Sequence, residues 1–136
     1  INELVHLSNI VMINSHENQI LLKNSQLSEE QLLDMLEQLV VTRGAKGVDV
    51  YESGRCVHVP AVEAIANIDP TGCGDAFRAG YIYGLMGNYS TKICARIGCV
   101  IASINLENRD SVYDFKEISI RKVKEVLKRE GLDIRL

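Results

Sequence analysis

Short apolar runs alternate with helix-forming stretches along the first half of the chain, and no other feature limits the possible folds as strongly. Residues 10–13 and 39–42 form two such runs, which suit buried strands. Between them, residues 17–23 are expected to be helical, and Ser28 with Gln31 three positions later marks the start of another helix. Strands that alternate with helices predict a layered α/β fold with a mostly parallel sheet.

The remainder of the chain adds an antiparallel hairpin and three helices. The hairpin begins at Val48, turns at residues 53–54 and returns to Pro60. The helices are expected from just after Gly74 to about Gly87, from Ser90 to about Leu106, and from Ser119 to Gly131.

Composition and charge argue against several classes of protein. The 136 residues are 46% hydrophobic and 24% charged, which indicates one folded domain rather than a disordered segment. The net charge of −3 argues against a nucleic-acid partner. No apolar run reaches the roughly 20 residues of a membrane-spanning helix, so we expect no membrane partner. The four cysteines lack the spacing of a zinc site or a disulfide framework, which favours a reduced, cytoplasmic chain.

Residues 69–80, with the sequence DPTGCGDAFRAG, carry most of the chemical information. Pro70 biases the preceding residue toward extended backbone, so a strand that leads in should end at Asp69. Gly72 and Gly74 allow a tight turn in which several N–H groups face one point. A helix is expected directly afterwards, and its first N–H groups and positive dipole end favour an anion. The residues therefore predict a site for a phosphate or a developing oxyanion.

Asp75 follows this loop directly, and two roles are open to it. A carboxylate beside a bound phosphate is repulsive unless it accepts the proton of a hydroxyl that attacks the phosphorus atom. Alternatively, the carboxylate only stabilises the helix N-terminus, as acidic residues there often do. The residues by themselves do not decide between a general base and a structural aspartate.

Two familiar nucleotide-binding motifs do not fit this loop. The Rossmann pattern would place a small residue where Phe77 stands, and no G-x-x-x-x-G-K-[ST] sequence occurs. By itself, the earlier stretch 44–47 is a tight connection of the kind found in hairpins.

Small residues recur along the two helices that follow the loop. These strips are Ala76, Gly80 and Gly84 on the first helix and Ala95, Cys99 and Ala102 on the second. We expect them to pack the two helices closely and so to fix the loop, rather than to contact a ligand.

Residues 69–80 resemble the C-terminal signature of the ribokinase-like (pfkB-type) carbohydrate and nucleoside kinases, D-[TP]-x-G-x-G-D-x-F. The resemblance implies a three-layer α/β/α ribokinase-like fold, present in part, and phosphoryl transfer from ATP to an alcohol. By the same resemblance, the N–H groups of Gly72, Cys73 and Gly74 would stabilise the transferred phosphoryl group. Asp75 would be the general base, and Thr71 would contribute to nucleotide binding.

Two upstream motifs resemble those of the same family and occur in the same order. Residues 14–17 match its N-x-x-E motif, which implies that Glu17 acts on Mg²⁺ mainly through metal-bound water. Asn14 would support the phosphate end of the nucleotide. Residues 42–47, TRGAKG, resemble the T-x-G-x-x-G turn that borders the ATP site. The nucleotide-binding residues implied by this turn are Thr42, Arg43, Gly44 and Gly47.

The resemblance also implies substrates and partners. ATP and Mg²⁺ would be required, and the variants DPTG and FRAG look closest to nucleoside and adenosine kinases, so we expect a nucleoside acceptor with a sugar as the alternative. A monovalent cation, K⁺, and a homodimer are further features of such kinases. The family often has a glycine-containing loop after its penultimate helix, whereas residues 107–113 contain no glycine. Neither K⁺ nor the adenine is therefore assigned to particular residues.

The family's N-terminal part, which carries most of the acceptor pocket and its lid, has no counterpart here. Since the sequence also begins with Ile1, residues 1–136 are expected to be the C-terminal portion of a kinase domain. A second hypothesis is a non-catalytic nucleotide-binding module, or a truncated remnant of such a kinase. A purely structural α/β domain would leave three ordered motifs to coincidence.

Overall fold

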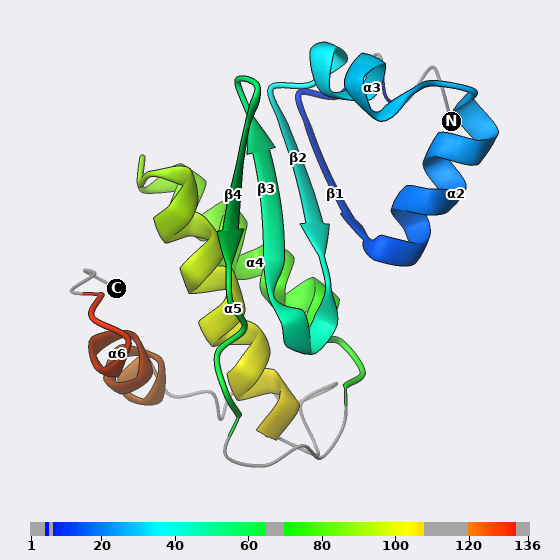
Figure 1. Ribbon diagram of the computed structural model, residues 1–136. Coiled ribbons are helices and arrows are strands. Elements are labelled where there is room, and N and C mark those ends of the chain that lie inside the picture. Colours follow the sequence, from blue (N-terminus) through cyan, green and yellow to red (C-terminus); the bar gives the residue numbers. More distant parts are fainter. Residues whose placement is uncertain (1–4, 6, 65–69, 108–119, 133–136) are drawn as a thin grey trace. The chain divides into compact units, whose positions relative to one another are not determined.

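The computed structural model describes residue 5 and residues 7–64, 70–107 and 120–132 (Figure 1). The strand end expected at Asp69, the helix start at Ser119 and most of the stretch 107–113 lie outside these residues. The chain divides into two compact units, Ile1–Pro60 and Ala61–Leu136.

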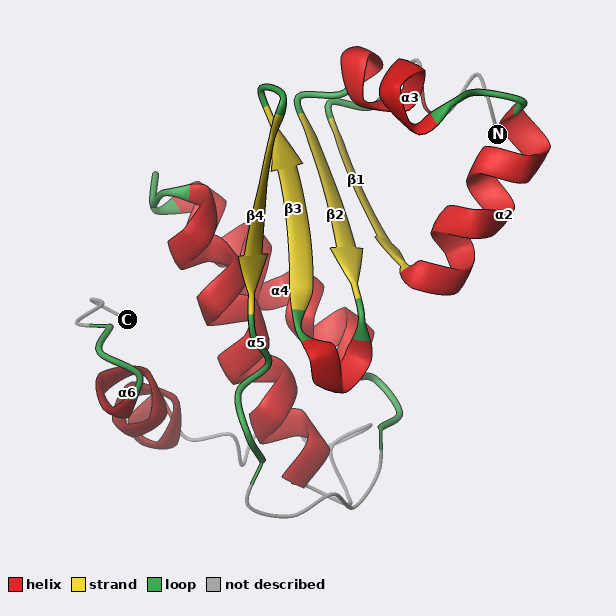
Figure 2. Cartoon of the chain, viewed as in Figure 1, coloured by secondary structure: helices red, strands yellow, loops and turns green. Residues whose placement is uncertain are grey.

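A four-stranded sheet in the order β1-β2-β3-β4 forms the centre of the first unit (Figure 2). β1 (Ile10–Asn14) pairs in parallel with β2 (Gln38–Thr42). β3 (Val48–Glu52) pairs antiparallel with β2 and with β4 (Arg55–Val59). The α/β class and the hairpin are confirmed, but the sheet is mixed rather than mostly parallel. The reason is local, because the few residues between β2 and β3 can join only antiparallel neighbours.

Two helices connect the parallel strands, as a parallel crossover requires. α2 (Ser15–Ser25) begins two residues before the predicted helix and ends two residues after it. α3 (Glu29–Met35) has the predicted cap, in which the Ser28 hydroxyl accepts from the Gln31 N–H at 3.1 Å and Gln31 Oε1 accepts from the Ser28 N–H at 2.9 Å.

One hydrophobic core fixes these helices to the sheet. Its buried members are Val5, Leu21, Leu32, Leu36, Leu39 and Val41. β2 is buried as predicted, whereas the first four residues of β1 are only half-buried. This difference follows from position, since β1 pairs with one described strand and β2 with two.

Three helices make up the described part of the second unit. They are α4 (Cys73–Met86), α5 (Thr91–Glu107) and α6 (Ile120–Arg129). α6 buries Val123 and Leu127. The helix ends at Arg129, two residues before the predicted end at Gly131. Gly131 follows with φ 77°, and the Leu132 N–H donates to the Leu127 carbonyl at 2.8 Å.

α4 and α5 approach each other at their glycines. A Cβ atom placed on Gly80 would lie 2.9 Å from the Cα of Gly98, and one on Gly84 would lie 2.8 Å from the Cα of Cys94. A Cβ on Gly98 would in turn lie 2.7 Å from the ring of Phe77. The predicted role of Gly80 and Gly84 in close helix packing is confirmed.

No helix within the described ranges combines the length and apolarity needed to cross a bilayer.

We expect the variant Gly84→Ala to lower the free energy of unfolding by up to about 2 kcal/mol. Alanine favours a helix interior by about 1 kcal/mol over glycine, but overpacking a tight contact costs about 1–3 kcal/mol. Urea denaturation followed by circular dichroism measures the change. The matched control is Gly74→Ala in the first turn of α4, where the new Cβ would meet only Arg78 Nη1, at 3.9 Å. Equal stability of the two variants would contradict the packing argument.

Candidate functional site

The glycine loop, residues 70–75, leads into α4 and presents backbone donors. Gly72 is the N-cap of α4 and has φ 79°, a left-handed conformation that glycine adopts without strain. The Ala76 N–H donates to the Gly72 carbonyl at 2.9 Å, and the Cys73 N–H donates to the Pro70 carbonyl at 3.2 Å. Within the described ranges, the N–H groups of Gly74 and Asp75 have no backbone acceptor. They lie at the positive end of the helix dipole, which suits an anion.

Asp75 lies in the first turn of α4 with its carboxylate in solvent. Its side chain is 84% exposed, and Oδ1 accepts from Arg78 Nη1 at 2.8 Å. Asp75 is also an acidic residue in the first turn of α4, where a negative charge suits the positive end of the helix dipole. An exposed carboxylate beside N–H groups that lack a backbone acceptor in the described part of the chain is accessible to a substrate hydroxyl.

Asn105 is a buried residue of α5 that the sequence analysis did not identify. Its Nδ2 donates to the Thr71 carbonyl at 3.0 Å and lies 3.6 Å from Cys73 Sγ. The Cys73 thiol also donates to the Ala102 carbonyl at 3.7 Å. A single amide among buried apolar neighbours near the end of α5 was the available signal, because a buried amide requires partners.

In the first unit, the second group of predicted residues lies at the carboxyl ends of the parallel strands. Asn14 and Thr42 are register partners at the ends of β1 and β2. The Thr42 hydroxyl donates to the Ile13 carbonyl at 3.5 Å, and the Ser15 hydroxyl donates to the Thr42 carbonyl at 3.3 Å. Ligands of open α/β sheets bind outside the carboxyl ends of the strands, so this edge suits a nucleotide.

The N-x-x-E motif forms a capping box at the start of α2. The Asn14 side chain accepts from the Glu17 N–H at 2.8 Å, and Glu17 Oε2 accepts from the Asn14 N–H at 2.8 Å. The two residues of the motif therefore have a structural role that needs no ligand. This contact also fixes the direction of the Glu17 carboxylate at the end of β1.

The turn after β2 has the geometry that its glycines predict. Gly44 has φ 57° and Gly47 has φ 95°, and the Arg43 N–H donates to the Gly47 carbonyl at 2.8 Å. The Arg43 guanidinium forms an ion pair with Asp49, whose other carboxylate oxygen lies 2.6 Å from His58 Nδ1. Arg43 is thus bonded to the next strand.

Asp49 is the centre of this three-residue network. Partial burial alone would raise the pKa of its carboxyl, but the hydrogen bonds to His58 and Arg43 outweigh burial and lower that pKa. The hydrogen bond between Arg43 and Asp49 also raises the pKa of the Arg43 guanidinium. The sequence analysis missed Asp49 and His58, although the hairpin register makes them direct cross-strand partners.

The predicted site residues are divided between the two units. Within each unit, the structure places its own predicted residues near one another. Asn14, Glu17 and the turn 42–47 belong to the first unit, whereas residues 71–75 belong to the second. Within the described ranges, no group of three or more histidine, cysteine, aspartate or glutamate side chains could hold a metal ion.

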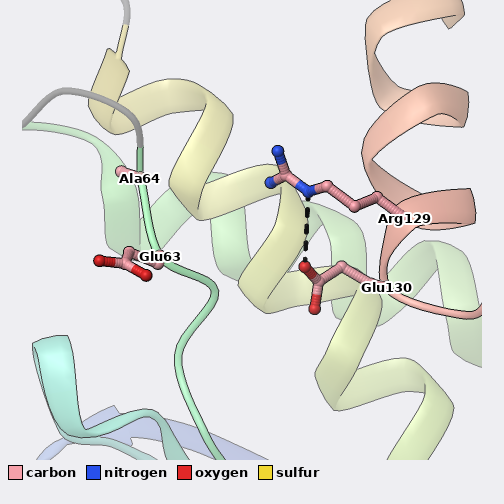
Figure 3. Close-up of a pocket in the computed structure, with 4 residues that line it drawn as sticks. All are labelled: Glu63, Ala64, Arg129 and Glu130. Atoms are coloured by element: carbon pink, nitrogen blue, oxygen red, sulfur yellow. Dashed lines mark ion pairs between the residues drawn. The ribbon is translucent and has the colours of Figure 1, made fainter.

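An open pocket of about 370 Å³ in the second unit involves none of the predicted residues (Figure 3). Its lining consists of Glu63, Ala64, Arg129 and Glu130. Glu130 forms ion pairs with Arg129 and Arg96, so its charge is already balanced within α5 and α6 and their flanking residues.

The comparison with protein families decides the classification. The model of the pfkB family of carbohydrate kinases matches residues 1–117. The chain belongs to this family. It is 30% identical over 105 residues to a nucleoside kinase from Methanocaldococcus jannaschii, an alignment that covers 77% of this chain and 35% of that protein. It is also 30% identical over 105 residues to a ribokinase from Lactococcus lactis, with 77% and 34% covered.

The solved structure of a nucleoside kinase from Burkholderia thailandensis in complex with inosine superimposes with a TM-score of 0.76 at 28% identity. The match covers 77% of this chain and 35% of that protein. The pfkB chain described here therefore has a partial ribokinase-like α/β fold and spans about a third of the length of these relatives.

We expect the variant Asp49→Asn to be less stable than the native pfkB chain at pH 7. Because the folded-state pKa of Asp49 is lowered, its carboxylate contributes stability above the ordinary value of 3.8 and loses it as the pH falls through the lowered pKa. Urea midpoints of the two proteins should therefore differ at pH 7 and converge below about pH 3.8. Asp34→Asn, which changes an exposed carboxylate, is the control. A difference that persists unchanged into acid would rule out the Asp49 network as its source.

Proposed function

We propose that this pfkB chain supplies the nucleotide and phosphoryl-transfer part of an ATP-dependent kinase that phosphorylates an alcohol group of a nucleoside or sugar. The observation that carries the proposal is the glycine loop, which combines Gly72 in a left-handed conformation, N–H groups at a helix start that have no backbone acceptor among the described residues, and an exposed Asp75. Membership of the family supports the same reaction class.

In the proposed reaction, Asp75 accepts the proton of the acceptor hydroxyl. The bond between that oxygen and the γ-phosphorus forms while the bond from the γ-phosphorus to the bridging oxygen of ATP breaks, which releases ADP. Charge develops on the phosphoryl oxygens during this step, and backbone donors aimed at them stabilise the transition state. The proposed donors are the N–H groups of Gly72, Cys73 and Gly74. That of Cys73 also donates to the Pro70 carbonyl at 3.2 Å, so it would be shared between that carbonyl and the phosphoryl group. An exposed carboxylate in the adjacent helical turn suits the role of base.

The residues of the first unit are proposed to bind the nucleotide and its metal ion. Glu17 offers a carboxylate, the ligand type that Mg²⁺ takes together with water and phosphate oxygens. When bound, Mg²⁺ would neutralise charge on the phosphates. Asn14 and Thr42 stand beside each other at the strand ends, where they can contact the polar groups of a nucleotide. The turn that includes Arg43, Gly44 and Gly47 is proposed to border the same ligand, and Thr71 to contribute from the glycine loop.

A nucleoside is the proposed acceptor, with a pentose sugar as the alternative. The nucleoside kinases from Methanocaldococcus jannaschii and Burkholderia thailandensis support the first, and the ribokinase from Lactococcus lactis supports the second. Assays with Mg·ATP and either inosine or D-ribose separate them. Binding of ATP without any phosphorylated product would favour the non-catalytic module instead.

We also propose that residues 1–136 are the C-terminal portion of the kinase domain and that the enzyme acts in the cytoplasm. The match to about a third of the length of the relatives supports a portion of such a domain, and the family resemblance of residues 69–80 to a C-terminal signature supports its place at the C-terminal end. The homodimer and the K⁺ requirement implied by the family resemblance stay predictions.

The variant Asp75→Asn should bind ATP normally but transfer phosphoryl groups about 10²–10⁴-fold more slowly, because a positioned general base contributes about that factor. Calorimetry measures ATP binding, and the ADP released in the presence of acceptor measures transfer. Near-normal turnover would remove Asp75 from the role of base.

Glu17→Gln separates the capping role of Glu17 from its role toward Mg²⁺. Glutamine can close the same capping box, so stability should stay within about 0.5 kcal/mol of the native protein. The Mg²⁺ concentration that half-saturates activity should rise, because the negative charge is lost. The comparison variant is Gln31→Glu in the capping box of α3, which exchanges the same two residue types where no metal role is proposed. An unchanged Mg²⁺ dependence would show that Glu17 acts only as a cap.

A further inference from the structure

The Asn105 amide contacts three consecutive residues of the glycine loop. Its Nδ2 donates to the Thr71 carbonyl at 3.0 Å and lies 3.6 Å from Cys73 Sγ. A Cβ atom placed on Gly72 would lie 3.6 Å from the same nitrogen and 3.9 Å from Oδ1, so the amide lies against Gly72. One side chain of α5 therefore contacts every residue from Thr71 to Cys73.

Burial makes this contact specific for one loop conformation. Asn105 is 8% exposed, and the preceding Ile104 is 1% exposed. A buried amide that loses its partner is left desolvated and unpaired, which is unfavourable. The Thr71 carbonyl supplies that partner only while the loop turns as it does at Gly72.

The helix that carries Asn105, α5, is itself held in place. α5 is held to α4 by the backbone contacts at Gly80 and Gly84, so its position cannot adjust to a different loop. A second contact comes from one turn earlier in α5, where the Ala102 carbonyl accepts from the Cys73 thiol at 3.7 Å. The start of α4 is thus tied to the end of α5 at two points.

We propose that Asn105 is the positioning residue of the phosphoryl-transfer loop, which sets the directions of the N–H groups of residues 72–74 through the Thr71 carbonyl. This inference rests on the proposed function of that loop. Donors that are already aimed cost no reorganisation when charge develops in the transition state. Loss of Asn105 should therefore reduce kcat while leaving the KM for ATP nearly unchanged, since all the proposed nucleotide contacts except that of Thr71 belong to the first unit.

The test compares three variants of the protein at its full natural length. Asn105→Leu removes both donor and acceptor, and Asn105→Asp keeps the shape but replaces the donor with an oxygen. The control is Ser103→Ala, which removes a buried hydroxyl of the same helix that donates to the Val100 carbonyl at 2.9 Å. Each variant is assayed with Mg·ATP and inosine or D-ribose. The ¹⁵N order parameters of Cys73 and Gly74 are measured without substrate.

We expect kcat to fall about 10–100-fold in both Asn105 variants, because a misplacement of about 1 Å costs about that much. The KM for ATP should change by less than about threefold, which is much less than the 10–100-fold loss of kcat. Order parameters at Cys73 and Gly74 should fall from about 0.85 toward 0.6 in both Asn105 variants. Ser103→Ala should match the native protein in all three measurements.

Native kcat, or native order parameters, in both Asn105 variants would overturn the inference. So would an equal loss of kcat in Ser103→Ala, which would assign the effect to the helix rather than to the amide. If the native protein transfers no phosphoryl group to either acceptor, the proposed function fails for these acceptors. The order parameters then still decide whether Asn105 holds the loop.

Discussion

The close approach of α4 and α5 is the contact on which the candidate site depends. At Gly80 and Gly84 the two helices meet with no space for even one further carbon atom. Backbone-to-backbone packing of this kind allows little sliding, since any shift opens voids or creates overlaps. The start of α4 and the end of α5 are therefore held in one arrangement. The packing of α4 against α5 therefore positions the glycine loop, and no contact with a ligand is needed for this.

A second constraint acts on the other group of site residues. The parallel pairing of β1 with β2 places Asn14 beside Thr42, and the helix cap at α2 orients Glu17. The Asp49 carboxylate then holds Arg43 at the start of the turn that follows β2. The glycine loop and the residues at the strand ends share one physical feature. In both, local hydrogen bonds orient the groups before any nucleotide is present. Such preorganisation reduces the entropy lost on binding and reaction.

Much of the fold could be predicted from local pattern. The Ser28 cap, the hairpin turn at residues 53–54 and the glycine packing of α4 all follow from short-range rules, and the predicted end of α6 is two residues too late. The pairing directions of the strands were harder to predict from the sequence, because the proportion of parallel pairs depends on which strands become neighbours in the sheet. The three-layer arrangement of the fold and the roles of the site residues stay predictions.

The contacts that the sequence did not predict are long-range. Asn105 meets Thr71 across 34 positions, and neither residue shows by its type that it needs the other. Arg43 matched the family turn, yet its guanidinium bonds to Asp49, which only the register of β2 with β3 reveals. The sequence analysis assigned a role only to the backbone N–H of Cys73, whereas its thiol also makes a hydrogen bond to α5. Tertiary partners of polar side chains cannot be derived from spacing alone.

The most direct test of the central claim is an NMR titration of the full-length protein with Mg·ADP and aluminium fluoride, which mimics a phosphoryl group in transfer. If the glycine loop stabilises that group, the amide resonances of Gly72, Cys73 and Gly74 will shift on addition of the mimic, with Gly74 among the largest changes. Shifts confined to other parts of the chain, with these three amides unmoved at saturation, would contradict the account.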